Sequence, residues 1–124
     1  MSRKSERGAV AVEFAILAPV LVMILLGIME FGRAYNVQST LTNSARESVR
    51  SMAINNSQAT ARTAAKTAAT QLSPALSDGN ITFSATDCTA GTQMTVTVSY
   101  NLSTLTGIAG PLAMTGKGTM LCGG

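Results

Sequence analysis

The chain carries one long apolar segment close to its N-terminus. Residues 9–29 contain a single charged side chain, Glu13, and no other polar side chain. A helix of this length measures about 31 Å, which matches the hydrocarbon thickness of roughly 30 Å in a bilayer. The pattern therefore predicts a transmembrane helix over residues 9–29.

The charges on either side of this segment predict its orientation. Residues 1–8 hold three basic side chains and one acidic side chain, whereas Glu30 and Arg33 balance each other on the other side. Short basic flanks stay in the cytoplasm. We therefore expect a single-pass protein of the cytoplasmic (inner) membrane, with its N-terminus inside and its C-terminal part outside the cytoplasm.

Beyond residue 29, apolar side chains recur at steps of three and four residues, which is typical of an amphipathic helix. This stripe consists of Phe31, Ala34, Tyr35, Leu41, Ala45, Val49 and Met52. Residues 54–58, INNSQ, favour an end of the helix or a tight link, because Asn and Ser side chains compete for backbone hydrogen bonds.

A second helix is expected next, with a face of small side chains that packs closely on the first helix. That face consists of Ala61, Ala64, Ala65, Ala68, Ala69 and Leu72. Ser73 and Pro74 should end this helix, because the residue before a proline avoids the helical conformation.

From Asn80 onward apolar and polar residues alternate, which indicates β-strands. Three strands are expected, with the sequences ITFSATDC, TQMTVTVSYNL and LAMTGKGTMLC. Within the third, GKG at 116–118 is interpreted as no more than a turn or an exposed lysine. The predicted fold is α+β and pilin-like in layout: a long N-terminal helix that is transmembrane in its first half, a second helix and a small antiparallel sheet. Residues 30–72 form the helical region outside the membrane, and residues 73–124 form the β-rich region.

The composition argues against most enzymes. The chain of 124 residues has no histidine, the commonest general base and metal ligand, and it shows no nucleophile motif, phosphate loop or metal-ligand cluster. A net charge of +3 is too small and too scattered for a nucleic-acid binder. We expect no catalytic residues, no metal or cofactor, no nucleic-acid partner and no small-molecule substrate.

Cys88 and Cys122 are the two cysteines. They lie outside the cytoplasm in the predicted topology, where disulfides persist. A bridge between them would stabilise the fold by roughly 3–4 kcal/mol in the chain-entropy model. A structural zinc site normally needs four ligands, so metal binding is not expected. We predict a disulfide, with two free thiols as the alternative.

RGAVAVEF, residues 7–14, resembles the processing site of type IV pilin-like proteins. The resemblance implies that a prepilin peptidase cuts between Gly8 and Ala9 on the cytoplasmic side, which makes residues 1–8 a leader peptide. Glu13 then becomes the fifth residue of the mature chain, followed by Phe14. In pilin-like assemblies this acid meets an N-terminal amine and sets the stagger between subunits, so Glu13 and Phe14 are assigned to assembly register.

The apolar segment also permits other interpretations. A carboxylate in the first turn, such as Glu13, is favoured by the helix dipole without any role in assembly. Pro19 removes one backbone hydrogen bond and predicts a kink. A basic start before an apolar run also describes a cleaved secretory signal peptide, although this run is long and lacks a small-x-small site after it. An uncleaved signal anchor is a further alternative.

Residues 7–50 resemble the N-terminal region of TadE-like proteins of the Tad (Flp) pilus assembly system. The matching positions are Gly8, Glu13, Phe14, Pro19, Gly27, Glu30, Gly32 and Arg33, followed by Ala45, Arg46, Glu47 and Arg50. The resemblance implies a minor pilin-like subunit, or pseudopilin. Its partners would be the prepilin peptidase, inner-membrane lipid, and other pilin and pseudopilin subunits that it meets through the N-terminal helix. The alternative is an uncleaved single-span protein with a small binding domain outside.

Overall fold

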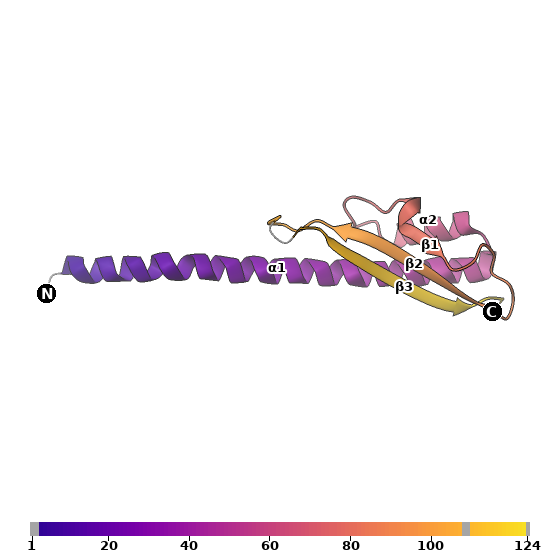
Figure 1. The fold of residues 1–124 in the computed structure, drawn as a ribbon, viewed down its shortest axis with the longest axis horizontal. Helices are drawn as coiled ribbons and strands as arrows, with labels where there is room; N and C mark the ends of the chain where they lie inside the picture. The colour runs from indigo at the N-terminus through magenta and orange to yellow at the C-terminus, as the bar shows by residue number, and fades with distance from the viewer. Residues whose placement is uncertain (1–2, 108–109, 124) are drawn as a thin grey trace. The chain divides into compact units, whose positions relative to one another are not determined.

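The computed structural model describes residues 3–107 and 110–123, and the chain divides into two compact units, Met1–Arg33 and Ala34–Gly124 (Figure 1). The elements are α1 (Arg3–Asn55), α2 (Gln58–Ala68), the 3-10 turn η1 (Asp78–Asn80), β1 (Ile81–Phe83), β2 (Gln93–Leu102) and β3 (Leu112–Leu121). The α+β class with a long N-terminal apolar helix, a second helix and a three-stranded antiparallel sheet is confirmed.

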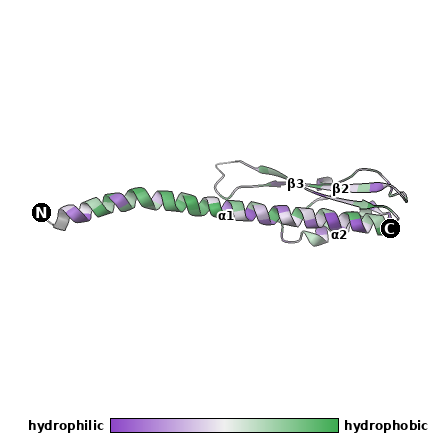
Figure 2. Cartoon of the chain, turned by 90° about the horizontal axis from the view of Figure 1, so that it is seen from below, coloured by the Kyte–Doolittle hydropathy of each residue, from purple (hydrophilic) through white to green (hydrophobic). Residues whose placement is uncertain are grey.

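The first unit consists of the N-terminal part of α1. From Ser5 to Arg33 no residue is buried, and the large apolar side chains lie on every side of the helix. Figure 2 shows this stretch as predominantly hydrophobic after the first turns. A helix that is apolar all round is stable only where apolar surroundings replace water. By length and composition α1 could cross a membrane, and none of its apolar window is buried inside the chain.

In the second unit α1 is amphipathic. Its apolar side chains at three- and four-residue steps are buried in the core: Val37, Leu41, Ala45, Val49 and Met52. Two members of the predicted stripe are not in this core, because Phe31 and Tyr35 are 76% and 70% exposed. Phe31 precedes the packed unit, and Tyr35 is turned about 100° around the helix from its neighbour Ala34, which touches the core.

The link between the helices lies where the INNSQ segment predicted it. Asn56 takes a positive φ of 47°, and Ser57 caps α2 by accepting a hydrogen bond from the Thr60 N–H at 3.3 Å. Helix α2 ends at Ala68, which is earlier than the end that Ser73 and Pro74 predicted. The chain leaves helical geometry at Ala69, where φ is −123°, so that Ala69 and Leu72 are buried beyond the last turn.

Close packing of α2 on α1 is confirmed, and two buried serines of α1 accompany it. Ser44 Oγ donates to the Ala65 carbonyl at 2.8 Å, and Ser48 Oγ donates to the Ala61 carbonyl at 2.9 Å. Both serines are fully buried. These bonds satisfy side chains that would otherwise be costly to bury.

The sheet has the order β1-β2-β3 and is antiparallel throughout. β2 and β3 pair over their whole length, from Gln93 opposite Leu121 to Leu102 opposite Leu112. Alternate side chains of β2 face the core: Met94, Val96, Val98, Tyr100 and Leu102. β1 is shorter than the predicted strand, because regular pairing stops after Phe83.

The interpretation of GKG as a turn is wrong, although Lys117 is exposed. Gly116 and Gly118 are buried in the middle of β3, opposite Val98 and Val96. A Cβ atom on Gly116 would lie 2.6 Å from the Thr42 amide nitrogen, and one on Gly118 would lie 2.8 Å from the Ala45 carbonyl oxygen. The two glycines therefore allow the backbone of β3 to lie directly against the backbone of α1.

Candidate processing and assembly segment

The predicted processing site lies in the first unit. Gly8 and Ala9 are exposed on α1, and no other part of the described chain comes within 4 Å of the position a Gly8 Cβ would take. Residues 1–2 of the predicted leader lie outside the described residues. The bond between Gly8 and Ala9 is therefore not covered by any packed element that the structure describes.

Glu13 follows Ala9 by four residues in a continuous helix. Residues at this spacing share a helix face and are about 6 Å apart along the axis. Cleavage before Ala9 would place a new ammonium group one helical turn from the Glu13 carboxylate. The geometry thus permits contact between this carboxylate and an N-terminal amine.

Phe14 belongs to an exposed face rather than to a core. It is 70% exposed and, with Glu6, Arg7, Val10 and Ala11, lines a surface hollow of about 600 Å³. All five residues come from the one helix. A hollow formed by one face of a single helix becomes a binding site only when a second molecule closes it.

Pro19 lies inside α1, which continues as helix on both sides. Its missing N–H leaves the Ala15 carbonyl without its usual partner four residues on. The kink stays a prediction.

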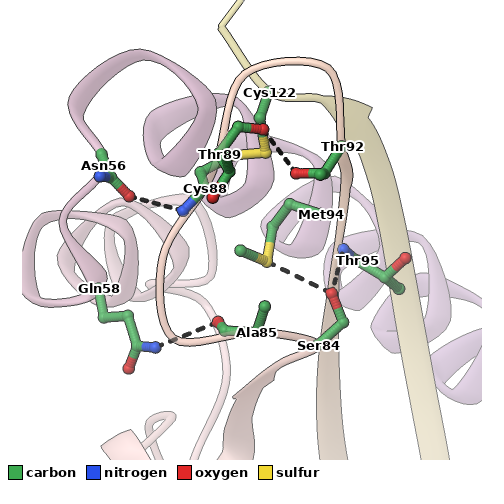
Figure 3. Close-up of a disulfide and its surroundings, with 10 residues drawn as sticks. All are labelled: Asn56, Gln58, Ser84, Ala85, Cys88, Thr89, Thr92, Met94, Thr95 and Cys122. Atoms are coloured by element: carbon green, nitrogen blue, oxygen red, sulfur yellow. Dashed lines mark hydrogen bonds between the residues drawn. A yellow bond between two sulfur atoms is a disulfide. The ribbon is translucent and has the colours of Figure 1, made fainter.

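Cys88 and Cys122 form a disulfide, as predicted, and the alternative of two free thiols is wrong (Figure 3). Their Cα atoms are 5.4 Å apart, and Cys122 is buried. The bridge joins the β1–β2 connection to the end of β3. Asn56, from the link between the helices, accepts a hydrogen bond from the Cys88 N–H at 2.7 Å. The sequence shows Asn56 as a link residue, and only the fold brings it to the disulfide.

In the second unit, two basic side chains of α2 bind η1 and β1, and the sequence does not reveal these contacts. Arg62 of α2 donates to the carbonyl oxygens of Asp78 and Ile81 at 2.5 and 2.6 Å, and its guanidinium lies 5.0 Å from the centre of the Phe83 ring. Lys66, one turn later, pairs with the Asp78 carboxylate at 2.5 Å, and this contact lowers the pKa of Asp78. These contacts hold η1 and β1 against α2.

No arrangement for metal chemistry is found in the part of the chain that the structure describes. There, no group of three or more His, Cys, Asp or Glu side chains is placed to hold a metal ion.

Comparison with known proteins identifies the N-terminal segment. Residues 8–50 match the family described as TadE-like protein. No curated protein and no solved structure matches the chain. The match covers the exposed apolar helix and continues into the part of α1 that packs in the second unit.

The match agrees with the resemblance that the sequence motifs indicated, and it associates the chain with a pilus, with structural rather than enzymatic proteins and with other pilus components. Together with the single apolar helix, it indicates a membrane-anchored protein. Residues 8–50 are thus similar to the TadE-like proteins of the Tad pilus system.

Proposed function

We propose that the protein is a minor pilin, or pseudopilin, needed for assembly of a Tad (Flp) type pilus. It enters the inner membrane as a single-pass precursor with its N-terminus in the cytoplasm and its second unit outside. A prepilin peptidase cuts it between Gly8 and Ala9, and the mature helix then packs with those of other pilin-like subunits.

The observation that carries this proposal is the exposure of α1 between Val10 and Met29. Its apolar side chains surround the whole helix, and none of them is buried among the residues that the structure describes. Such a surface needs lipid around it before assembly and other helices around it afterwards. One exposed face would need only one partner, whereas a fully apolar circumference suits transfer from a bilayer into a helix bundle.

Glu13 carries the one charged side chain within this apolar surface. The free-energy cost of placing that charge in a membrane supports a specific role for it. A charged side chain costs roughly 2.5–3.5 kcal/mol at the centre of a membrane span on insertion scales, and less for Glu13, which lies near the start of the span. An ammonium group at Ala9 of its own chain or of a neighbour would offset that cost. Pairing with a neighbour would fix the stagger between two subunits, because only one axial offset brings the two charges together.

Intact-mass analysis of the protein from native membranes tests the processing step. A chain that begins at Ala9 supports the proposal. A chain that begins at Met1 contradicts it and favours an uncleaved single-span protein with a small binding domain. A start beyond Met29 would show a secreted domain. Gly8→Leu should block cleavage, whereas Gly27→Ala, in the same helix, should be processed normally.

The register role needs a separate test on processed protein. Glu13→Gln keeps the size of the side chain and removes its charge, and Glu6→Gln is the matched control because Glu6 lies before the cut. We expect Glu13→Gln to be cleaved normally and to lower the amount of pili sheared from cells. Wild-type amounts of pili with cleaved Glu13→Gln protein would disprove the register role and leave the processing result standing.

A further inference from the structure

The two outer strands of the sheet differ in how their free edges are covered. β1 has three residues, and Arg62 donates to the outward-facing Ile81 carbonyl at 2.6 Å. Strand edges expose unpaired N–H and C=O groups that can pair with another chain. At β1 this edge is short and is capped by the Arg62 guanidinium.

β3 presents a much longer edge. The Ser84 N–H donates to the Thr95 carbonyl at 2.9 Å, so Thr95 faces β1 and the next residue, Val96, faces β3. Val96 lies opposite Gly118, and backbone direction alternates along an antiparallel strand. Lys117 and Thr119 therefore direct their backbone groups away from β2.

Contacts of this outer edge with the rest of the unit are few. Gln38 Nε2 donates to the Thr115 carbonyl at 2.8 Å, which confirms the direction of the outward-facing groups. Among the described residues, the outward backbone groups of Lys117 and Thr119 have no hydrogen-bond partner. Two positions in the middle of a ten-residue strand are thus available for pairing.

A polar groove runs along α1 beside this edge. It has a volume of about 290 Å³ and is lined by Gln38, Ser39, Thr42, Asn43 and Arg46. Gln38 also bonds β3, and the Cβ position of Gly118 lies 2.9 Å from the Arg46 amide nitrogen. The close approach of β3 to α1 therefore brings the strand edge and the groove together.

The outer edge of β3 and the neighbouring groove are positively charged. Lys117 lies on the strand edge, Arg46 lines the groove, and both are exposed. No acidic side chain lines the groove. A partner strand that carries carboxylates would complement both cations while its backbone pairs with β3.

We propose that the open edge of β3 binds an extended acidic segment of another protein by strand addition. The partner backbone pairs with Lys117 and Thr119. Gly116 and Gly118 face α1, so Lys117 lies on the other face of the sheet, and neighbouring carboxylates of the partner face Lys117 on that side and Arg46 on the side of α1. A second copy of this chain is a poorer occupant, because antiparallel pairing of two β3 strands about their centres brings the two Lys117 side chains together. This inference goes beyond the proposed pilin role and does not depend on it.

The test uses the full chain in detergent micelles and a capped eight-residue Val–Glu peptide, in which pairs of Val alternate with pairs of Glu so that carboxylates lie on both faces of the strand. We expect the amide protons of Lys117 and Thr119 to exchange at least tenfold more slowly when the peptide is bound. Lys117→Glu and Arg46→Glu should each weaken peptide binding at least tenfold. Arg50→Glu is the matched control, since Arg50 is exposed on the same helix but does not line the groove. It should change the affinity less than twofold.

Two further peptides separate strand addition from simple charge attraction. The peptide methylated on every backbone nitrogen should lose binding, because neither of its edges can then donate to β3, and the Val–Lys peptide should not bind. Equal binding of the methylated peptide, an equal effect of Arg50→Glu, or no binding of the Val–Glu peptide would overturn the proposal. Protection of the Lys117 and Thr119 amides that rises with protein concentration alone would overturn it in favour of self-pairing.

Discussion

Two leucines of the same helix have opposite surroundings. Leu25, in the first unit, is 60% exposed, whereas Leu41, in the second, is completely buried. Both occupy regular turns of α1, so the helix itself does not distinguish them. The difference lies in what surrounds the helix. Around Leu41 the chain supplies its own apolar partners, and around Leu25 it supplies none.

Polar side chains repeat this contrast. Ser44 and Ser48 are buried in the second unit, and each donates to a carbonyl of α2. Glu13 is exposed among apolar neighbours in the first unit. The second unit satisfies its buried polar groups internally. Between Val10 and Met29 the first unit presents apolar surface and one carboxylate, that of Glu13, for which it supplies no buried surroundings.

Matched leucine substitutions should show the largest contrast. Leu41→Ala should lower the free energy of unfolding of the second unit by about 4 kcal/mol, because it leaves a cavity in a packed core. Leu25→Ala should leave that free energy unchanged. The measurement is urea unfolding of the full chain in detergent micelles, followed by the fluorescence of buried Tyr100. A loss of stability in Leu25→Ala comparable to that in Leu41→Ala would show that the two units do not differ in this way.

Removal of the disulfide should lower the stability of the second unit and leave that of the first unit unchanged. The bridge closes a span of 34 residues, and the Cys88→Ala/Cys122→Ala double variant should lose about 3–4 kcal/mol. Backbone amides of β2 should exchange faster, while helical amides between Val10 and Met29 keep their protection. Faster exchange in both places would contradict independent stability of the two units.

Substitution of two glycines should show where the backbone is closely packed and where it is not. Gly116→Ala should cost about 2–3 kcal/mol, since its Cβ would overlap the α1 backbone. Gly27→Ala, with no atoms within 4 Å of its Cβ position, should leave the second unit unaffected. Thermal unfolding followed by Tyr100 fluorescence compares them. Equal melting temperatures for Gly116→Ala and the wild type would disprove direct contact of β3 with α1.

The smallest effect should come from the exposed pair of Lys66 and Asp78. Lys66 lowers the pKa of Asp78, so the folded state binds this proton less readily than the unfolded state. The contribution to stability is therefore complete above the ordinary pKa of an aspartate and disappears as the pH falls through the lowered value. Asp78→Asn should melt slightly below the wild type at pH 7, and the gap should narrow as the pH falls below the ordinary pKa of an aspartate. A gap that is as wide in acid as at pH 7 would assign the effect to something other than charge.

Local sequence patterns were sufficient to predict those helices and strands whose burial or exposure follows from their own residues. The unbroken apolar run predicted the exposed helix, and the alternation in TVTVSYNL predicted a half-buried strand that the structure confirms as part of β2. The cysteine pair was predicted because only two cysteines exist to be joined. The family motif at Gly8, Glu13 and Phe14 was likewise visible before any fold was known.

Features that depend on two distant segments were missed or placed wrongly. Gly116 and Gly118 look like turn residues by themselves, and only the approach of α1 explains why β3 needs them. Ser44 and Ser48 appear polar and surface-seeking until α2 supplies carbonyls for them. The early end of α2 was likewise missed: the chain leaves the helix at Ala69, and Ala69 and Leu72 are buried beyond its last turn.

The sequence by itself determined which segments are helix and strand and which surface must leave water, because periodicity and hydrophobicity act over a few neighbouring residues. Tertiary structure alone decided how closely β3 lies on α1, which edge of the sheet is capped, and that Asn56 and Cys88 meet. Those outcomes depend on distances between segments tens of residues apart, and such distances are set by packing of the whole unit.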